Sequence, residues 1–413
     1  MSTRRVATCS TEPDLAAAGA AAKFKAALIL TGGGARAAYQ VGVLKAVREL
    51  LPLPEQNPFS ILCGTSAGAI NAATLAVNAD NFDAAVSNLL EVWENMHVRH
   101  IYRADPLSVA KTGARWLAAM MLLSRTSPVS LLDNAPLGEM LASNLDFGRV
   151  QKNIDDGCLY AVSITCSGYS SGQSVSFYQG GPGVQAWERS QRIGCAMPLR
   201  VEHLMASAAL PFIFPAVRIN REYFGDGTMR QIAPISPALH LGADRILVIS
   251  TGRQVSDPAR VRANKYPTLA QIAGHGLNSI FLDSLHVDIE RVERINQTIS
   301  MIPKDKLLES GTALRPVKVL VISPSQAIER VATRYLRDLP WTIRYLLRGI
   351  GAMNRNGSNL ASYLLFERGF CRALIDMGYR DTMARRTEVV EFFDGPRAGV
   401  ATTGGVHQQP GAD

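Results

Sequence analysis

The sequence predicts an α/β fold in which helices cover both faces of a parallel or mixed sheet. Up to about residue 250, apolar runs rich in β-branched residues alternate with segments of helical spacing. These runs are almost continuously apolar, which is typical of strands buried on both faces. The composition agrees with a large core, because 47% of the residues are hydrophobic and only 19% are charged.

The individual elements follow this pattern along the chain. The first part has predicted strands in 25–33, 158–167, 174–180 and 244–252, helices in 37–50 and 200–210, and a strand that turns into a helix in 59–77. Beyond residue 255 we predict helices in 267–299, 327–336, 341–353 and 360–379, and one strand in 317–323. Because that late strand needs partners, the second half is expected to add to the same sheet.

Charge and the rarer residues narrow the class of protein. The formal net charge of +8 suits contact with nucleic acid, anionic lipid or an acidic substrate. No run of five basic residues, zinc-finger pattern or aromatic RNA-binding motif occurs, so nucleic acid is not expected as a partner. The six cysteines and seven histidines show no metal-ligand spacing. This predicts no metal site, and free thiols in a reducing compartment.

The two ends of the chain differ from the rest. Residues 1–25 lack the apolar core of a signal peptide, and we predict a flexible leader. Residues 396–413 are small, polar and rich in glycine, which predicts a disordered tail. No stretch reaches the ~18 apolar residues of a membrane span. The predicted location is cytoplasmic, or peripheral to a membrane.

Three consecutive glycines, Gly32-Gly33-Gly34, lie between the first predicted strand and helix. They weaken both neighbours, so a group is expected to approach this backbone closely. The chain lacks the P-loop pattern, and the acidic residue of a dinucleotide site has only Glu55 to supply it, in a proline-flanked loop. Nucleotide binding is therefore disfavoured, and the free N–H groups suit a developing oxyanion better. Arg36, just inside the next helix, is placed to orient the loop or to attract an anionic substrate.

The second motif is G-x-S-x-G, from Gly64 to Gly68, where an apolar strand becomes a helix. A sharp turn at this point exposes the hydroxyl of Ser66, and the two glycines remove side chains that would clash. The N-terminus of the helix also directs its positive dipole end at the serine. An ordinary Gly/Ser turn that caps the helix is the alternative.

The third motif is Asp226, which stands between Gly225 and Gly227. The flanking glycines predict a tight, exposed turn from which the carboxylate can face another loop. A plain β-turn is the alternative, because Asp-Gly is a common turn signal.

The three motifs together resemble the patatin-like phospholipase family, in particular its bacterial members. The family pattern combines G-G-G-x-R/K, G-x-S-x-G and D-G-G/A, which correspond here to Gly32-Gly33-Gly34 with Arg36, to Gly64–Gly68 and to Asp226-Gly227. The resemblance extends over about residues 26–250. The sequence departs from the pattern at Ala37, where glycine is usual, and at Thr228, where glycine or alanine is usual.

This resemblance implies a three-layer α/β/α sandwich with a mixed, mainly parallel sheet. It implies a catalytic domain in 26–250 and a mainly helical extension in 251–395. The activity would be that of a lipid acyl hydrolase acting on phospholipids or related lipids, without a metal or organic cofactor. By this resemblance Ser66 is the nucleophile and Asp226 its base, Gly32, Gly33 and Gly34 form the oxyanion hole, Gly64 and Gly68 shape the nucleophile elbow, and Arg36 positions substrate or loop.

Several alternatives stay open at this point. A Ser–Asp–His site would need His240, His275 or His286, all of which follow Asp226. A catalytically silent lipid-binding protein would keep the fold and lose the serine or the aspartate, but this sequence keeps both. An acyltransferase would share the acyl-enzyme and differ only in the acceptor.

Two segments suit contact with a membrane surface. Residues 106–126 and 339–353 each place arginines and a tryptophan beside an apolar run, as in interfacial helices. A helix packed on the core is the alternative for each, and the Met-rich part of the first suits the wall of an acyl pocket.

Overall fold

The computed structural model describes residues 24–394 except 109, 112, 115–129, 254–267, 279–283, 310–313, 350 and 354–356. Almost all of the predicted leader, the whole predicted tail and much of segment 106–126 lie outside the described residues. The predicted division into a catalytic domain and a helical extension stays a prediction.

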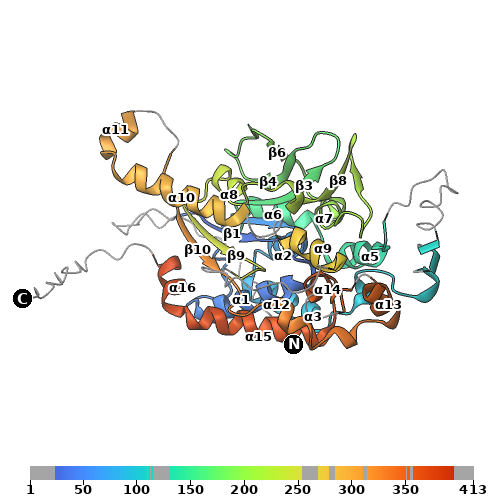
Figure 1. The fold of residues 1–413 in the computed structure, drawn as a ribbon. Helices are drawn as coiled ribbons and strands as arrows, with labels where there is room; N and C mark the ends of the chain where they lie inside the picture. Colours follow the sequence, from blue (N-terminus) through green and yellow to red (C-terminus); the bar gives the residue numbers. More distant parts are fainter. Residues whose placement is uncertain are drawn as a thin grey trace, which may run out of the picture.

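One ten-stranded sheet forms the centre of the described part of the chain (Figure 1). Five neighbouring strands are parallel, in the order β10 (Lys318–Ile322), β9 (Arg245–Ile249), β1 (Ala26–Leu30), β2 (Ile61–Thr65) and β3 (Ala161–Gly168). The sheet continues from β3 through β4 (Ser174–Gly180), β6 (Arg192–Ala196) and β5 (Trp187–Arg189), and β8 (Glu222–Asp226) pairs with β3 and β7 (Val217–Ile219). Because β4 and β8 run antiparallel to β3, the sheet is mixed and mainly parallel.

Helices cover both faces of this sheet, as the sequence predicts. Leu28 and Leu30 of β1 point into the larger core, which holds α1 (Ala38–Leu50), α2 (Ala67–Val77), α3 (Phe82–Glu94) and α15 (Arg368–Ala384). Ala27 and Ile29 point the other way, toward α8 (Ser236–His240) and α10 (Ser284–Ser300). Successive strand residues alternate between faces, so these two cores establish the three-layer α/β/α sandwich.

The remaining helices surround these layers. They are α5 (Ala135–Asn144), α6 (Gly148–Asp155), α7 (Val201–Ser207), α9 (Leu269–Asn278), α11 (Lys304–Glu309), α12 (Ile328–Ala332), α13 (Trp341–Gly349), α14 (Ser358–Leu364) and α16 (Arg386–Phe393). In the described part of the chain, no helix is both long and apolar enough to cross a membrane.

The second half is built onto the same sheet, as predicted. β10 pairs with β9 along its whole length, and α15 packs closely on α1. Glycines permit that approach, because a Cβ on Gly378 would lie 2.2 Å from the carbonyl oxygen of Tyr39. The prediction of one continuous helix in 360–379 is wrong, because the structure has two helices there, α14 and α15, separated by residues 365–367.

Candidate active site

Ser66 lies at the sharp turn between β2 and α2. Its backbone has φ 55° and ψ −131°, in a region that residues other than glycine rarely adopt. Such strain persists only where the surroundings impose it. The predicted glycines allow the chain to close here, since a Cβ on Gly68 would lie 2.3 Å from the carbonyl oxygen of Leu30. A Cβ on Gly64 would lie 2.5 Å from the Cα of Ala69.

Ser207, at the end of α7, holds this turn in place. Its hydroxyl accepts a hydrogen bond from the backbone N–H of Ser66 at 2.8 Å and donates one to the carbonyl oxygen of Thr165 at 2.6 Å. Sequence reasoning missed Ser207, because a small polar residue in an apolar helix carries no motif.

Asp226 ends β8 directly beside Ser66. The Ser66 hydroxyl donates to its Oδ2 at 2.6 Å, and the N–H and hydroxyl of Thr228 donate to its Oδ1 at 3.0 and 2.6 Å. The prediction of an exposed turn is wrong, since Asp226 is only 1% exposed. The strand is the reason, because Asp226 is paired with Cys166 of β3.

Burial dominates the electrostatics of this carboxylate. It raises the pKa of Asp226, although the hydrogen bonds from Ser66 and Thr228 oppose the change by favouring the charged form. A carboxylate with a raised pKa is a stronger base, which suits removal of a proton from a hydroxyl.

The glycine loop lies between β1 and the 3-10 helix Gly34–Ala37, and Gly34 borders the same cavity as Ser66 and Asp226. The hydroxyl of Thr251 donates to the carbonyl oxygen of Gly32 at 2.6 Å, and the side-chain amide of Gln40 donates to that of Thr31 at 2.7 Å. These contacts use carbonyl oxygens. The N–H groups of Gly32, Gly33 and Gly34 bond to no protein acceptor among the described residues.

Arg36 is buried and does not line the cavity. It is 2% exposed, and its guanidinium contacts Asn359, Ser362 and the ring of Tyr363, all on α14. Of the two roles that the sequence suggests, this geometry fits orientation of the loop, because the guanidinium contacts α14 and does not line the cavity.

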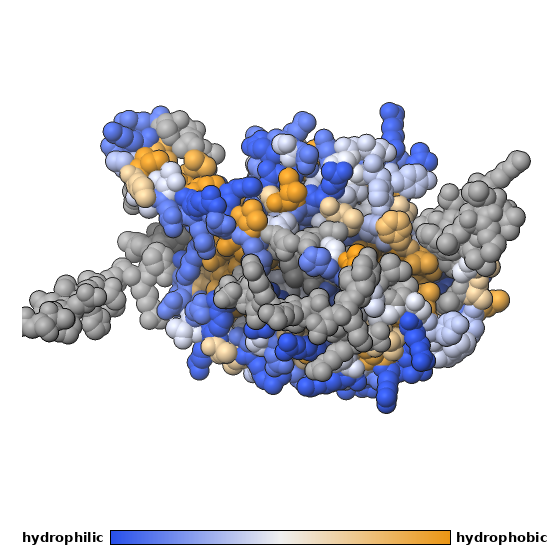
Figure 2. Space-filling model, in the orientation of Figure 1, coloured by the Kyte–Doolittle hydropathy of each residue, from blue (hydrophilic) through white to orange (hydrophobic). Residues whose placement is uncertain are grey.

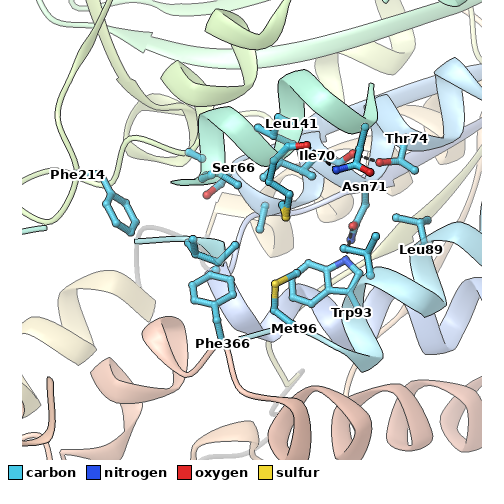
Figure 3. A pocket seen from close by; sticks show the side chains of 18 of the residues that line it. Ser66, Ile70, Asn71, Thr74, Leu89, Trp93, Met96, Leu141, Phe214 and Phe366 are labelled. Atoms are coloured by element: carbon cyan, nitrogen blue, oxygen red, sulfur yellow. Dashed lines mark hydrogen bonds between the residues drawn. The ribbon is translucent and has the colours of Figure 1, made fainter. Parts of the chain in front are cut away.

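An apolar cavity opens beside Ser66 (Figure 3). Its lining comes from α2, α3, α5, α14 and the segments that follow α3, α7 and α14. It includes Ile70, Leu89, Trp93, Met96, Leu141, Phe214 and Phe366. The polar side chain of Asn71 is bonded to Gln40 and to the indole N–H of Trp93, at 2.9 and 2.8 Å. The wall therefore suits a hydrocarbon chain, since most of its lining is apolar and the Asn71 amide is satisfied within the protein.

Comparison with known proteins identifies the family to which this chain is related. The family described as patatin-like phospholipase matches residues 28–239. The chain belongs to the patatin-like phospholipase family. This confirms the resemblance that the three motifs predict.

Individual relatives are more distant. A cGAMP-activated phospholipase of Pseudomonas aeruginosa is 29% identical over 213 residues, which are 52% of this chain and 55% of that protein. The chain thus spans about half the length of this curated relative. Among solved structures, VipD from Legionella pneumophila is similar with 11% identity and a TM-score of 0.34, over 90% of this chain and 67% of that one. The type III effector ExoU has 12% identity and a TM-score of 0.32, over 89% of this chain and 53% of that one. Human GIVD cytosolic phospholipase A2 has 11% identity and a TM-score of 0.40, over 90% of this chain and 60% of that one. At these scores the structural likeness supports no functional argument.

One departure from the family pattern has a clear place in the site. Thr228 supplies two of the hydrogen bonds that hold the Asp226 carboxylate. Glycine or alanine at this position would retain only the backbone donor. Ala37, the other departure, is fully buried in the larger core.

His240, His275 and His286, the three candidates for a Ser–Asp–His site, do not contact Ser66 or Asp226. His240 stacks on Trp187 with ring centroids 5.0 Å apart, and His275 and His286 are exposed on α9 and α10. None of them lines the cavity. The direct contact between Ser66 and Asp226 also leaves no room for an imidazole between them. Within the described ranges, no cluster of three or more metal-ligating side chains occurs.

Proposed function

We propose that this protein is a serine lipid acyl hydrolase that cleaves carboxylic ester bonds of phospholipids or related lipids. The observation that carries this proposal is the 2.6 Å hydrogen bond from Ser66 to the buried Asp226, at the wall of an apolar cavity. Membership of the patatin-like phospholipase family supports the lipid class of substrate.

The chemistry would proceed through an acyl-enzyme. Asp226 takes the hydroxyl proton as Oγ of Ser66 attacks the ester carbonyl, and the N–H groups of Gly32, Gly33 and Gly34 hold the oxyanion. The intermediate collapses, and Asp226 returns the proton to the departing alcohol oxygen. Water then attacks the acyl-enzyme, gives a proton to Asp226, and the fatty acid leaves as Ser66 recovers its hydrogen.

The decisive experiment maps the nucleophile and the products together. Wild-type protein treated with a fluorophosphonate is expected to carry the adduct on Ser66, as located by mass spectrometry of its peptides. Incubation with phosphatidylglycerol or phosphatidylethanolamine vesicles is expected to release free fatty acid. An adduct elsewhere, or none on the folded protein while a known serine hydrolase reacts, would refute the proposal. Acylation of an added alcohol in place of fatty acid release would identify an acyltransferase.

A lipid substrate must be reached at a surface, and the cavity mouth offers an apolar contact. Phe212 is 73% exposed and lies between Leu210 and Phe214, both of which line the cavity. Its backbone has φ 67°, and its carbonyl oxygen accepts a hydrogen bond from the N–H of Leu131 at 2.8 Å. Figure 2 shows orange, apolar residues among the hydrophilic ones across the middle of the molecule, in the orientation of Figure 1. We therefore extend the proposal to peripheral contact between this mouth and a lipid surface.

Phe212→Ser is expected to weaken binding to anionic vesicles by about tenfold. Full burial of a phenylalanine side chain in an apolar phase contributes about 1.5–3 kcal/mol. Co-sedimentation with vesicles measures the effect, in a Ser66→Ala background so that the lipid stays intact. Met301→Ser is the control, because Met301 is 81% exposed beyond the end of α10 and does not line the cavity. Equal weakening by both substitutions would argue against a specific contact at the mouth.

A further inference from the structure

We infer that Asn359 and Ser362, two residues of α14, act through Arg36 as positioning residues for the glycine loop. This inference rests on the proposed function, because the position of the loop amides matters only if they hold an oxyanion. α14 lies beyond residues 28–239, the part of the chain that matches the family. The active site would therefore be completed by a segment outside the recognised domain.

The first observation is the way in which α14 receives a buried charge. Arg36 lies two residues after Gly34, and a buried guanidinium requires close polar partners. Its Nε donates to the hydroxyl oxygen of Ser362 at 2.8 Å. A terminal nitrogen donates to both the backbone and the side-chain carbonyl oxygens of Asn359. The guanidinium carbon also lies 3.9 Å from the centre of the Tyr363 ring.

The acceptors on α14 are held in orientation by hydrogen bonds that do not involve Arg36. The side-chain nitrogen of Asn359 donates to the carbonyl oxygen of Gly274 on α9 at 2.9 Å, which turns its oxygen toward Arg36. The Ser362 hydroxyl donates its hydrogen to the backbone carbonyl of Asn359 at 2.6 Å and leaves its lone pairs to accept. These contacts fix the direction in which the acceptor oxygens of Asn359 and Ser362 face the guanidinium of Arg36.

The loop backbone also rests on the backbone of α14. Gly34 has φ 54°, and a Cβ at this position would lie 2.3 Å from the carbonyl oxygen of Tyr363. Tyr363 and Gly34 border the cavity together with Ser66 and Asp226. A shift of α14 would therefore move the loop amides relative to the Ser66 hydroxyl, and a misplacement of about 1 Å can cost roughly 100-fold in rate.

A positioning role predicts a particular kinetic signature. The ester in its ground state is bound by the apolar cavity, whereas the oxyanion forms only in the transition state. Loss of alignment in the loop should lower kcat and leave KM nearly unchanged. A purely structural role for α14 would instead lower the fraction of folded protein, without this separation.

Three variants on one helix test the inference, with a short-chain nitrophenyl ester as substrate. Asn359→Ala removes the side-chain acceptor and is expected to lower kcat about 10- to 100-fold at constant KM. Asn359→Asp keeps an acceptor oxygen for Arg36 but loses the donor to Gly274, so it should restore only part of kcat. Ser358→Ala is the matched control, because the buried Ser358 hydroxyl donates to the backbone carbonyl oxygen of Glu329 on α12. It should reduce thermal stability and leave kcat unchanged.

Hydrogen–deuterium exchange separates this inference from the proposed function. Asn359→Ala should accelerate exchange of the amides in residues 32–36 and leave those of α2 unchanged, whether or not any ester is cleaved. Wild-type protein that fails to react with esters would refute the function alone. Unchanged loop exchange in Asn359→Ala, or an equal loss of kcat in Ser358→Ala, would overturn the positioning role.

Discussion

Asp226→Asn is expected to lower kcat for ester hydrolysis by about 1,000-fold, toward the residual rate of Ser66→Ala. General-base catalysis contributes roughly 10²- to 10⁴-fold. An asparagine oxygen can still accept the hydrogen bond from Ser66, but it cannot take the proton. Steady-state hydrolysis of a short-chain ester measures the loss, and the rate of phosphonate labelling gives an independent value.

Asp226→Asn is also expected to change the free energy of unfolding. The burial of Asp226 decides whether the variant is more or less stable than wild type. Because burial raises the pKa of Asp226, the folded state holds the proton more tightly than the unfolded state does. The stabilisation by protonation is complete below the unfolded pKa and is lost as pH rises through the folded pKa. Asp226→Asn should therefore be more stable than wild type at neutral pH, with the difference shrinking in acid. Thermal melts at several pH values provide the measurement.

Activity should show the opposite dependence on pH, because the base acts only when deprotonated. The wild-type rate of ester hydrolysis is expected to fall on acidification at a pH above the ordinary pKa range of an aspartate.

His240→Ala serves as the control for Asp226→Asn and should retain the wild-type rate. If the folded His240 variant loses as much activity as Asp226→Asn, a three-residue site would replace the Ser–Asp pair.

Gly34→Ala is expected to lower kcat by about 100- to 1,000-fold, the effect of losing one oxyanion donor. The added Cβ would meet the carbonyl oxygen of Tyr363 at 2.3 Å, on a backbone with φ 54°. The loop must then move away from α14, and its N–H groups move with it. Ester kinetics and phosphonate labelling report the change.

Gly157→Ala is the matched control for this substitution. Gly157 also has a positive φ, 75°, but a Cβ there would meet nothing within 4 Å. It should carry only the conformational cost of the left-handed region, roughly 1–2 kcal/mol, with kcat unchanged. Retention of full activity in Gly34→Ala would show that the loop amides do not hold the oxyanion.

Much of this architecture could be predicted because its signals are local. Continuous apolar runs indicate strands buried on both faces, and the strand-to-helix turns at Gly32-Gly33-Gly34 and Ser66 lie within a few residues of where the motifs place them. Gly64 and Gly68 predict that another part of the backbone lies close by, and the structure has such contacts at both positions.

Other parts of the site could not be predicted, because their side chains have no local signal. Ser207 supports the Ser66 turn from another helix, and Ser362 contacts Arg36 across 326 residues of sequence. Thr228 stood out only as a departure from the family pattern, yet its hydroxyl bonds to Asp226. The burial of Asp226 follows from pairing between β8 and β3, which turn residues alone do not reveal.

The amino-acid sequence by itself determined the sandwich, the two strand-to-helix turns and the residue types at the candidate site. Backbone sterics and hydrophobic periodicity act over a few residues, so their traces can be read along the chain. Only the tertiary structure decided that Asp226 meets Ser66 in a buried contact and that α14 receives Arg36. Those contacts depend on how distant elements pack, and packing is a property of the whole core rather than of any segment.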